Sequence, residues 1–138
     1  MMERLRDKAY HVFAGYDSRE HIPFKVCAHS LARRSTYPVE VTPIYHKTLR
    51  HAGMFYRPWK IDEDGQYWDE VDGKPFSTEF SHSRFLVPEI ARRNNLSGWV
   101  LFCDCDYLFL SDVCEVFDYC DDDYAVDRKS TRLNSSHW

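Results

Sequence analysis

An unbroken apolar run that ends in two acids constrains this chain more than any other feature. Residues 99–103 read Trp-Val-Leu-Phe-Cys, and Asp104 and Asp106 follow at once. A short apolar run after a glycine is typical of a buried strand, most often a central strand of a parallel sheet. Side chains alternate along a strand, so we expect the two carboxylates to point one way and Cys105 the other.

The pair of acids predicts a divalent-metal site. Two adjacent carboxylates repel one another unless a cation lies between them. Open α/β sheets bind ligands at the carboxyl ends of their strands, and hard oxygen ligands suit Mg²⁺ or Mn²⁺. A structural alternative remains, in which Asp104 is a solvated acid at a strand end and Asp106 or Asp112 caps the next helix.

The first third of the chain predicts a βαβ unit. Residues 10–14 form a short apolar run, and a helix is expected from about residue 21 or 23 to 34. A second strand is expected over 39–45, where Pro43 suggests an edge or an end. Strand, helix and strand in this order imply a parallel, right-handed connection. The expected fold class is therefore α/β.

The middle of the chain is a long aromatic connection. Residues 46–77 mix aromatic and acidic side chains, and turn signals suggest a small hairpin over 67–74. Long connections in compact domains are usually functional or disordered, and this one is too aromatic for disorder. We interpret it as a lid or pocket wall, with an aromatic satellite core as the alternative.

Three further elements are expected in the second half. A helix over 77–94 has an apolar face and a kink or break at Pro88. Ser111 and Asp112 look like the cap of a short helix over 113–119. Residues 124–126 look like the beginning of another strand.

Composition fits one soluble domain and excludes some partners. The 138 residues carry a net charge of −4, which argues against nucleic acid as a partner. No apolar run is long enough to span a membrane, and the charged N-terminus has no apolar signal core behind it. The five cysteines lack zinc-type spacing and are interpreted as mostly buried free thiols. A cytoplasmic location is therefore expected.

Four stretches, taken together, resemble the nucleotide-sugar glycosyltransferases of the GT-A fold, especially the family-eight-like branch. They are the strand and turn Val-Phe-Ala-Gly-Tyr-Asp at 12–17, the run Ser-His-Ser-Arg-Phe-Leu-Val-Pro at 81–88, the acid strand at 99–106 and the returning strand at Tyr124. The resemblance covers about residues 10–126. It implies a Rossmann-like, mostly parallel nucleotide-binding sheet.

The resemblance also implies roles for individual residues. In that family the turn after the first strand contacts the nucleoside, which falls here on Gly15, Tyr16 and Asp17. The helix arginine reaches the donor sugar or diphosphate, which falls on Arg84. The acid pair holds Mn²⁺ or Mg²⁺, and its first member often touches the ribose; these residues are Asp104 and Asp106. The implied activity is metal-dependent transfer of a sugar from a nucleotide sugar, a UDP-sugar, to an unknown glycan, protein or lipid acceptor.

The last twelve residues depart from this pattern. Residues 127–138 resemble one reading frame of a common sequencing adapter, so we exclude them from the fold as a non-native tail. Residues 1–126 are then expected to be the N-terminal donor-binding part of a GT-A domain, truncated after the acid strand. Related enzymes often complete the metal shell with a later histidine, and His137 is not expected to serve. No catalytic base is identifiable, and activity is expected of a longer parent rather than of this chain.

Two other functions fit parts of the sequence. In haloacid-dehalogenase-type phosphatases an apolar strand also ends in Asp-x-Asp, and the first acid, here Asp104, would be the nucleophile. Leu108 stands where that family usually has a small hydroxyl residue or valine, and its motif usually lies near the N-terminus. A non-catalytic sugar-binding module is the third possibility, with the aromatic segment 55–76 stacking on sugars.

Overall fold

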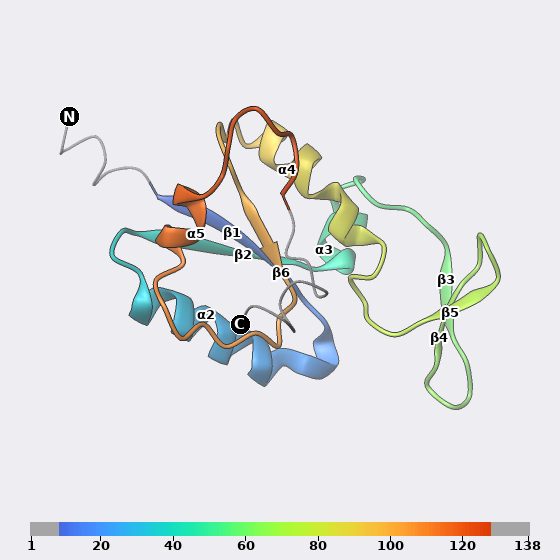
Figure 1. Ribbon diagram of the computed structural model, residues 1–138. Helices are drawn as coiled ribbons and strands as arrows, with labels where there is room; N and C mark the ends of the chain where they lie inside the picture. The colour runs from blue at the N-terminus through green and yellow to red at the C-terminus, as the bar shows by residue number, and fades with distance from the viewer. Residues whose placement is uncertain (1–8, 128–138) are drawn as a thin grey trace, which may run out of the picture.

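The structure, a computed structural model, describes residues 9–127. The chain is an α/β protein with two three-stranded sheets (Figure 1). One sheet is parallel with strand order β2-β1-β6, and the other is an antiparallel meander in the order β3-β4-β5. The tail that we interpret as adapter-derived lies, apart from Asp127, outside the described residues.

The predicted βαβ unit is confirmed. Strand β1 (Tyr10–Gly15) is followed by a 3₁₀ turn η1 (Ser18–Glu20), helix α2 (His21–Arg34) and strand β2 (Val39–Ile44). The two strands pair in parallel over their whole lengths. Because β2 is bonded only to β1 within the described sheet, its proline lies on an edge strand, as expected.

The acid strand is shorter and less central than predicted. Strand β6 (Leu101–Cys103) pairs in parallel with β1, but Trp99 and Val100 precede it without strand pairing. Within residues 9–127 it is an edge strand, and β1 is the central one. Residues 124–126 form no strand there, so that prediction was wrong too. An apolar run indicates that a strand is buried, but it does not tell how many other strands pair with it. The strand order therefore could not be predicted from this run alone.

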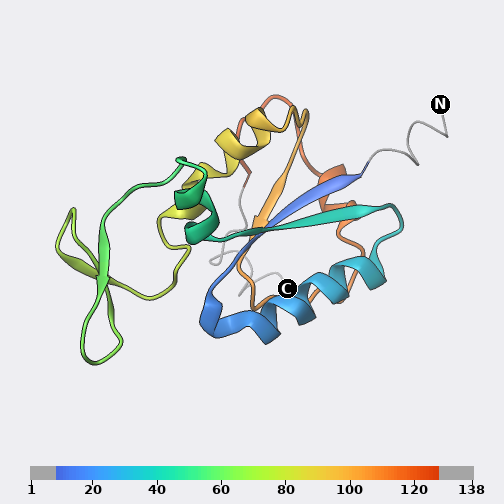
Figure 2. The same ribbon diagram turned by 180° about the vertical axis from the view of Figure 1, so that it is seen from behind.

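Helices cover both faces of the parallel sheet. Figures 1 and 2 show α2 on one face and α3 (His46–His51) with α4 (Val87–Arg93) on the other. Side chains of β1 alternate between the two cores. Val12 points to the core that contains Cys27 and Leu31, and Phe13 points to the core that contains Ile44 and Ile90.

The small sheet stands beside the end of the parallel sheet at which β1 and β2 finish (Figure 1). It consists of β3 (Trp59–Ile61), β4 (Tyr67–Asp69) and β5 (Lys74–Phe76). The β4–β5 pairing is the hairpin that the turn signals predicted. A third strand joins it, so the aromatic connection has secondary structure of its own.

The helix predicted over 77–94 is divided. The structure has a 3₁₀ turn η2 (Ser83–Leu86) and then α4, with Pro88 in the first turn of α4. Proline lacks the N–H that a helix interior needs, but it suits a first turn, so it begins this helix rather than bending a longer one.

The C-terminal helix and the thiols agree with expectation. Helix α5 (Cys114–Asp118) begins where Asp112 Oδ1 accepts the Cys114 N–H at 2.9 Å. All five cysteines are free; four are buried and Cys120 is partly exposed. In the part of the chain that the structure describes, no helix has both the length and the apolar character needed to cross a membrane.

Candidate functional site

The two predicted metal ligands lie in the turn directly after β6. Asp104 is partly buried and Asp106 is exposed, whereas Cys105 between them is fully buried. The expected in-and-out alternation is therefore present. It is produced by a turn, however, because the strand itself ends at Cys103. A turn leaves the acids free of the sheet's hydrogen-bond ladder, at the carboxyl edge where open α/β sheets bind ligands.

The charges around Asp104 identify its neighbours. Burial and the negative charge of Asp106 raise the pKa of Asp104, and the charge of Glu20 adds to the effect. The positive charge of Arg84 acts in the opposite direction. The charges of Glu20, in η1, and of Arg84, in η2, thus both act on Asp104. A cation bound beside Asp104 would relieve the same repulsion that raises its pKa.

The loop after β1 contacts the acid turn directly. The Cys105 thiol donates to Glu20 Oε2 at a distance of 3.0 Å. Burial and the neighbouring Glu20 carboxylate raise the pKa of the Cys105 thiol to about 12, so it stays protonated and acts as a donor. This contact joins two loops that are 85 residues apart in the sequence.

Asp17 holds the loop after β1 in shape. Its fully buried carboxylate accepts two hydrogen bonds from the Arg19 guanidinium, at 2.9 and 2.6 Å, and others from the backbone N–H groups of Arg19 and Glu79. Burial acts to raise the pKa of Asp17, but these hydrogen bonds outweigh it and the pKa is lowered. Its carboxylate is thus ionised and already engaged within the protein.

Gly15 and Tyr16 form the wall of this loop. A Cβ atom at Gly15 would lie only 2.4 Å from Cδ2 of Phe80, so the ring of Phe80 requires a glycine here. The Tyr16 ring packs edge-on against Phe24 and Tyr45. Of the three residues assigned to the nucleoside, Tyr16 is the only one that is not fully or almost fully buried.

Arg84 lies in η2 and is exposed. Its guanidinium stands over the ring of Phe85, with 5.0 Å between the guanidinium carbon and the ring centroid. Among residues 9–127 it forms no ion pair, although its charge is felt at Asp104. A planar guanidinium with free donors beside an acid turn is suited to binding an oxyanion.

Glu79 is a buried centre of this region that the sequence reasoning did not identify. Its carboxylate accepts hydrogen bonds from the Ser18 hydroxyl at 2.5 Å, the Ser18 N–H at 3.2 Å and the Tyr67 hydroxyl at 2.8 Å. Glu79 therefore ties the loop after β1 to the small sheet. The local sequence gives no signal for it, because its partner Ser18 lies 61 residues away.

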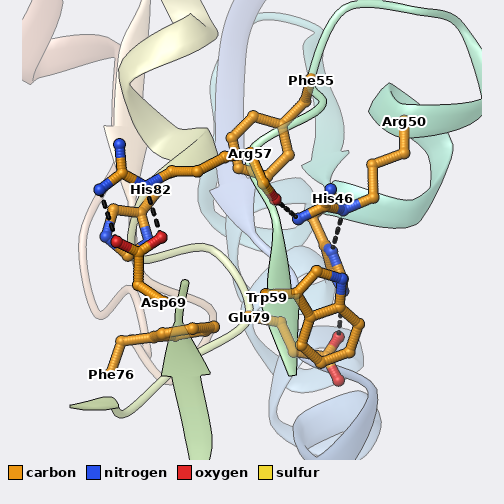
Figure 3. A pocket seen from close by; sticks show the side chains of 9 residues that line it. All are labelled: His46, Arg50, Phe55, Arg57, Trp59, Asp69, Phe76, Glu79 and His82. Atoms are coloured by element: carbon orange, nitrogen blue, oxygen red, sulfur yellow. Dashed lines mark hydrogen bonds and ion pairs between the residues drawn. The ribbon is translucent and has the colours of Figure 1, made fainter. Parts of the chain in front are cut away.

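A small cavity lies between the small sheet and α3. Its volume is about 10 Å³, which is room for about one water molecule. Figure 3 shows His46 between Arg50 and Glu79, beside the ring of Trp59. The His46 Nδ1 accepts from Arg50 Nε at 3.0 Å, and its Nε2 lies 3.7 Å from Glu79 Oε2 without a hydrogen-bond partner in the described chain. Burial lowers the pKa of His46, so the ring is neutral.

This cavity is too small for a nucleotide, and the side chains that line it bond to one another. Arg57 donates two hydrogen bonds of 2.6 Å to the buried carboxylate of Asp69, which closes the cavity from the side of the small sheet. The aromatic connection is therefore packed against the loop after β1. Its rings pack on one another as the aromatic satellite core that we expected as the alternative, and a role as lid or pocket wall stays a prediction.

The acid pair has no third ligand in the described chain. Among residues 9–127 no group of three or more histidine, cysteine, aspartate or glutamate side chains is arranged to hold a metal ion. Two carboxylates still fit one class of metal site, because Mg²⁺ is often bound through one or two carboxylates together with substrate phosphates and water.

Comparison with known proteins gives one informative match. The chain is 43% identical over 119 residues to Protein CDI of Arabidopsis thaliana. The match covers 86% of this chain and 40% of the relative, so the chain spans well under half of the curated protein that it resembles. No protein-family model matches the chain, and no solved structure matches it.

Proposed function

We propose that this chain is the donor-binding part of a metal-dependent glycosyltransferase of the GT-A type, and that it binds a nucleoside diphosphate sugar, a UDP-sugar, through Mn²⁺ or Mg²⁺. The observation that carries the proposal is the acid pair Asp104 and Asp106 at the carboxyl edge of a parallel sheet, in a turn that is bonded through Cys105 to the loop after β1. Because the chain spans 40% of its relative, sugar transfer itself is proposed for a longer parent.

The chemistry of the donor explains why both signs of charge are needed. Departure of a nucleoside diphosphate develops negative charge on phosphate oxygens, and a bound divalent ion stabilises that charge. Asp104 and Asp106 would hold the ion, and their mutual repulsion favours its binding. The Arg84 guanidinium would bind the remaining phosphate oxygens or the sugar hydroxyls.

The loop after β1 supplies the nucleoside side of the proposed site. Tyr16 is the residue there with accessible surface, and its ring is fixed by two aromatic neighbours. Gly15 and Asp17 act by shaping the loop: one lets Phe80 approach and the other binds Arg19. Their roles in nucleoside binding are thus proposed to be indirect.

Calorimetric titration of the chain with UDP, in Mn²⁺ and in EDTA, tests the proposal. We expect binding that requires Mn²⁺ and that is lost in the double variant D104N/D106N, because both metal ligands lose their charge. Arg84→Ala is expected to weaken binding by about tenfold, the cost of one charge-assisted contact.

A matched control distinguishes the loss of these two metal ligands from a change in the net charge of the protein. The variant D118N/D123N removes two exposed acids of the same type from α5 and the turn after it, and should bind UDP as the parent chain does. Binding that ignores Mn²⁺, or that survives D104N/D106N, would refute the proposal. Trapping of beryllofluoride on Asp104 would instead favour the phosphatase.

A further inference from the structure

The outer face of the small sheet carries an open hollow that the proposed donor site does not use. Its volume is about 670 Å³. It is lined by Lys60, Asp62, Trp68, Asp69, Glu70 and Gly73. The inner face of the same sheet carries Tyr67 and packs against the loop after β1. Because side chains alternate along β4, Trp68 points to the opposite face.

Trp68 is the centre of this hollow and its ring is held in place. It pairs directly with Lys60 on one neighbouring strand and with Pro75 on the other, so all three share the outer face. Its indole Nε1 donates to Asp62 Oδ2 at 2.8 Å. The ring is partly exposed, although it belongs to a sheet with a well-buried inner face. A fixed, partly exposed indole is therefore presented to solvent.

Polar groups of both kinds flank the ring. The other oxygen of Asp62 accepts the backbone N–H groups of Asp64 and Gln66, both at 2.9 Å, so this carboxylate mainly fixes the ring and its turn. Lys60 and Glu70 are exposed, and within residues 9–127 neither side chain forms a hydrogen bond or an ion pair. One free donor and one free acceptor thus lie beside the ring.

We propose that this face, defined by Trp68, Lys60 and Glu70, binds a neutral carbohydrate chain. The apolar C–H face of a sugar ring would pack against the indole, because both surfaces are apolar and are removed from water by the contact. Hydroxyl groups would donate to Glu70 and accept from Lys60. Lys60 and Glu70 contribute one charge of each sign, and Asp62, whose oxygens accept three N–H groups, adds one negative charge. The hollow thus carries no large charge of one sign, which favours an uncharged polar ligand over a polyanion or polycation.

This site lies on the face of the small sheet opposite the loop that belongs to the donor site, because Tyr67 bonds Glu79 on the inner face and Trp68 alternates with it. It goes beyond the proposed function, because it needs neither a metal nor a nucleotide. It would hold a glycan on the small sheet, apart from the parallel sheet that carries the acid turn. Failure of UDP binding would therefore leave this inference standing, and failure of glycan binding would leave the donor site standing.

Nuclear magnetic resonance titration with neutral hexasaccharides tests the inference. The four probes are β-linked chains of glucose, of xylose and of mannose, and an α-linked chain of glucose. All titrations are done in EDTA, so that no metal ion takes part. We expect at least one probe to shift the Trp68 indole resonance, which is assigned by its absence in Trp68→Phe, at millimolar concentration. Trp68→Ala should weaken binding of that probe by at least tenfold, and Trp68→Phe should weaken it less because a ring remains.

Two controls keep the test decisive. Trp99→Phe removes a partly buried indole that donates to Asp122, and should leave binding unchanged. If Trp68→Ala disturbs the small sheet, Glu70→Gln and Lys60→Met change only exposed groups and should still weaken binding about two- to threefold. The inference is overturned if no probe shifts the Trp68 indole, if binding survives Trp68→Ala, or if only a proline-rich peptide binds there.

Discussion

Replacing Gly15 by alanine tests the packing that shapes the loop after β1. A Cβ atom there would lie 2.4, 2.6 and 2.7 Å from three atoms of the Phe80 ring. Such distances require the ring to move, yet Phe80 is only 3% exposed and packs near Phe102. Overpacking of this kind typically costs about 1–3 kcal/mol, and we expect Gly15→Ala to lie at the upper end, about 3 kcal/mol.

Urea unfolding followed by circular dichroism measures this cost, with the slope on denaturant checked for constancy. The double variant G15A/F80L isolates its cause. Phe80→Leu alone should cost about 1–2 kcal/mol by leaving space in the core. Because the alanine methyl fills part of that space, the double variant should be more stable than the sum of the single costs by at least about 1 kcal/mol.

Gly53→Ala is the control for backbone effects. No atom lies within 4 Å of its added Cβ, but its φ of +74° makes a side chain unfavourable by about 1–2 kcal/mol. The reasoning fails if Gly15→Ala costs no more than Gly53→Ala, or if the Gly15 and Phe80 costs simply add. Either result would mean that Phe80 does not occupy the space beside the loop.

Three further predictions concern charged groups. Burial and the Glu79 carboxylate raise the pKa of Tyr67 to about 12, so the stability that this tyrosine contributes is full below about pH 10 and is lost as pH rises through about 12. In Glu79→Gln the pKa of Tyr67, followed by the absorbance of its phenolate, should be lower because the neighbouring negative charge is removed. Asp106→Asn should lower the pKa of Asp104, measured by carboxyl carbon resonances, because it removes a like charge. Asp112→Ala should reduce the free energy of unfolding by about 1–2 kcal/mol in urea, since its carboxylate accepts hydrogen bonds from the Cys114 N–H and from Thr36, and Asp112→Asn should cost less.

Local patterns predicted the βαβ unit, and distant contacts account for what they missed. Apolar periodicity and Pro43 lie within the elements that they describe, so β1, α2 and β2 could be inferred from neighbouring residues. Glu79 could not, because its partner Ser18 lies 61 residues away. The pairing of β6 with β1 likewise depends on a contact between distant segments rather than on the sequence of β6 alone. Asp104 and Asp106 were predicted as a pair because both lie in one short motif.

The loop after β1, which belongs to the proposed donor site, is held in place by three other parts of the chain. Tyr16 N–H donates to the Ile44 carbonyl at 2.9 Å, Glu79 binds Ser18, and Cys105 donates to Glu20. The loop is thus fixed from β2, from the segment after the small sheet and from the acid turn. A ligand that binds a fixed loop loses little free energy to ordering it. Loosening any one of these ties should therefore weaken ligand binding even where the substituted side chain touches no ligand.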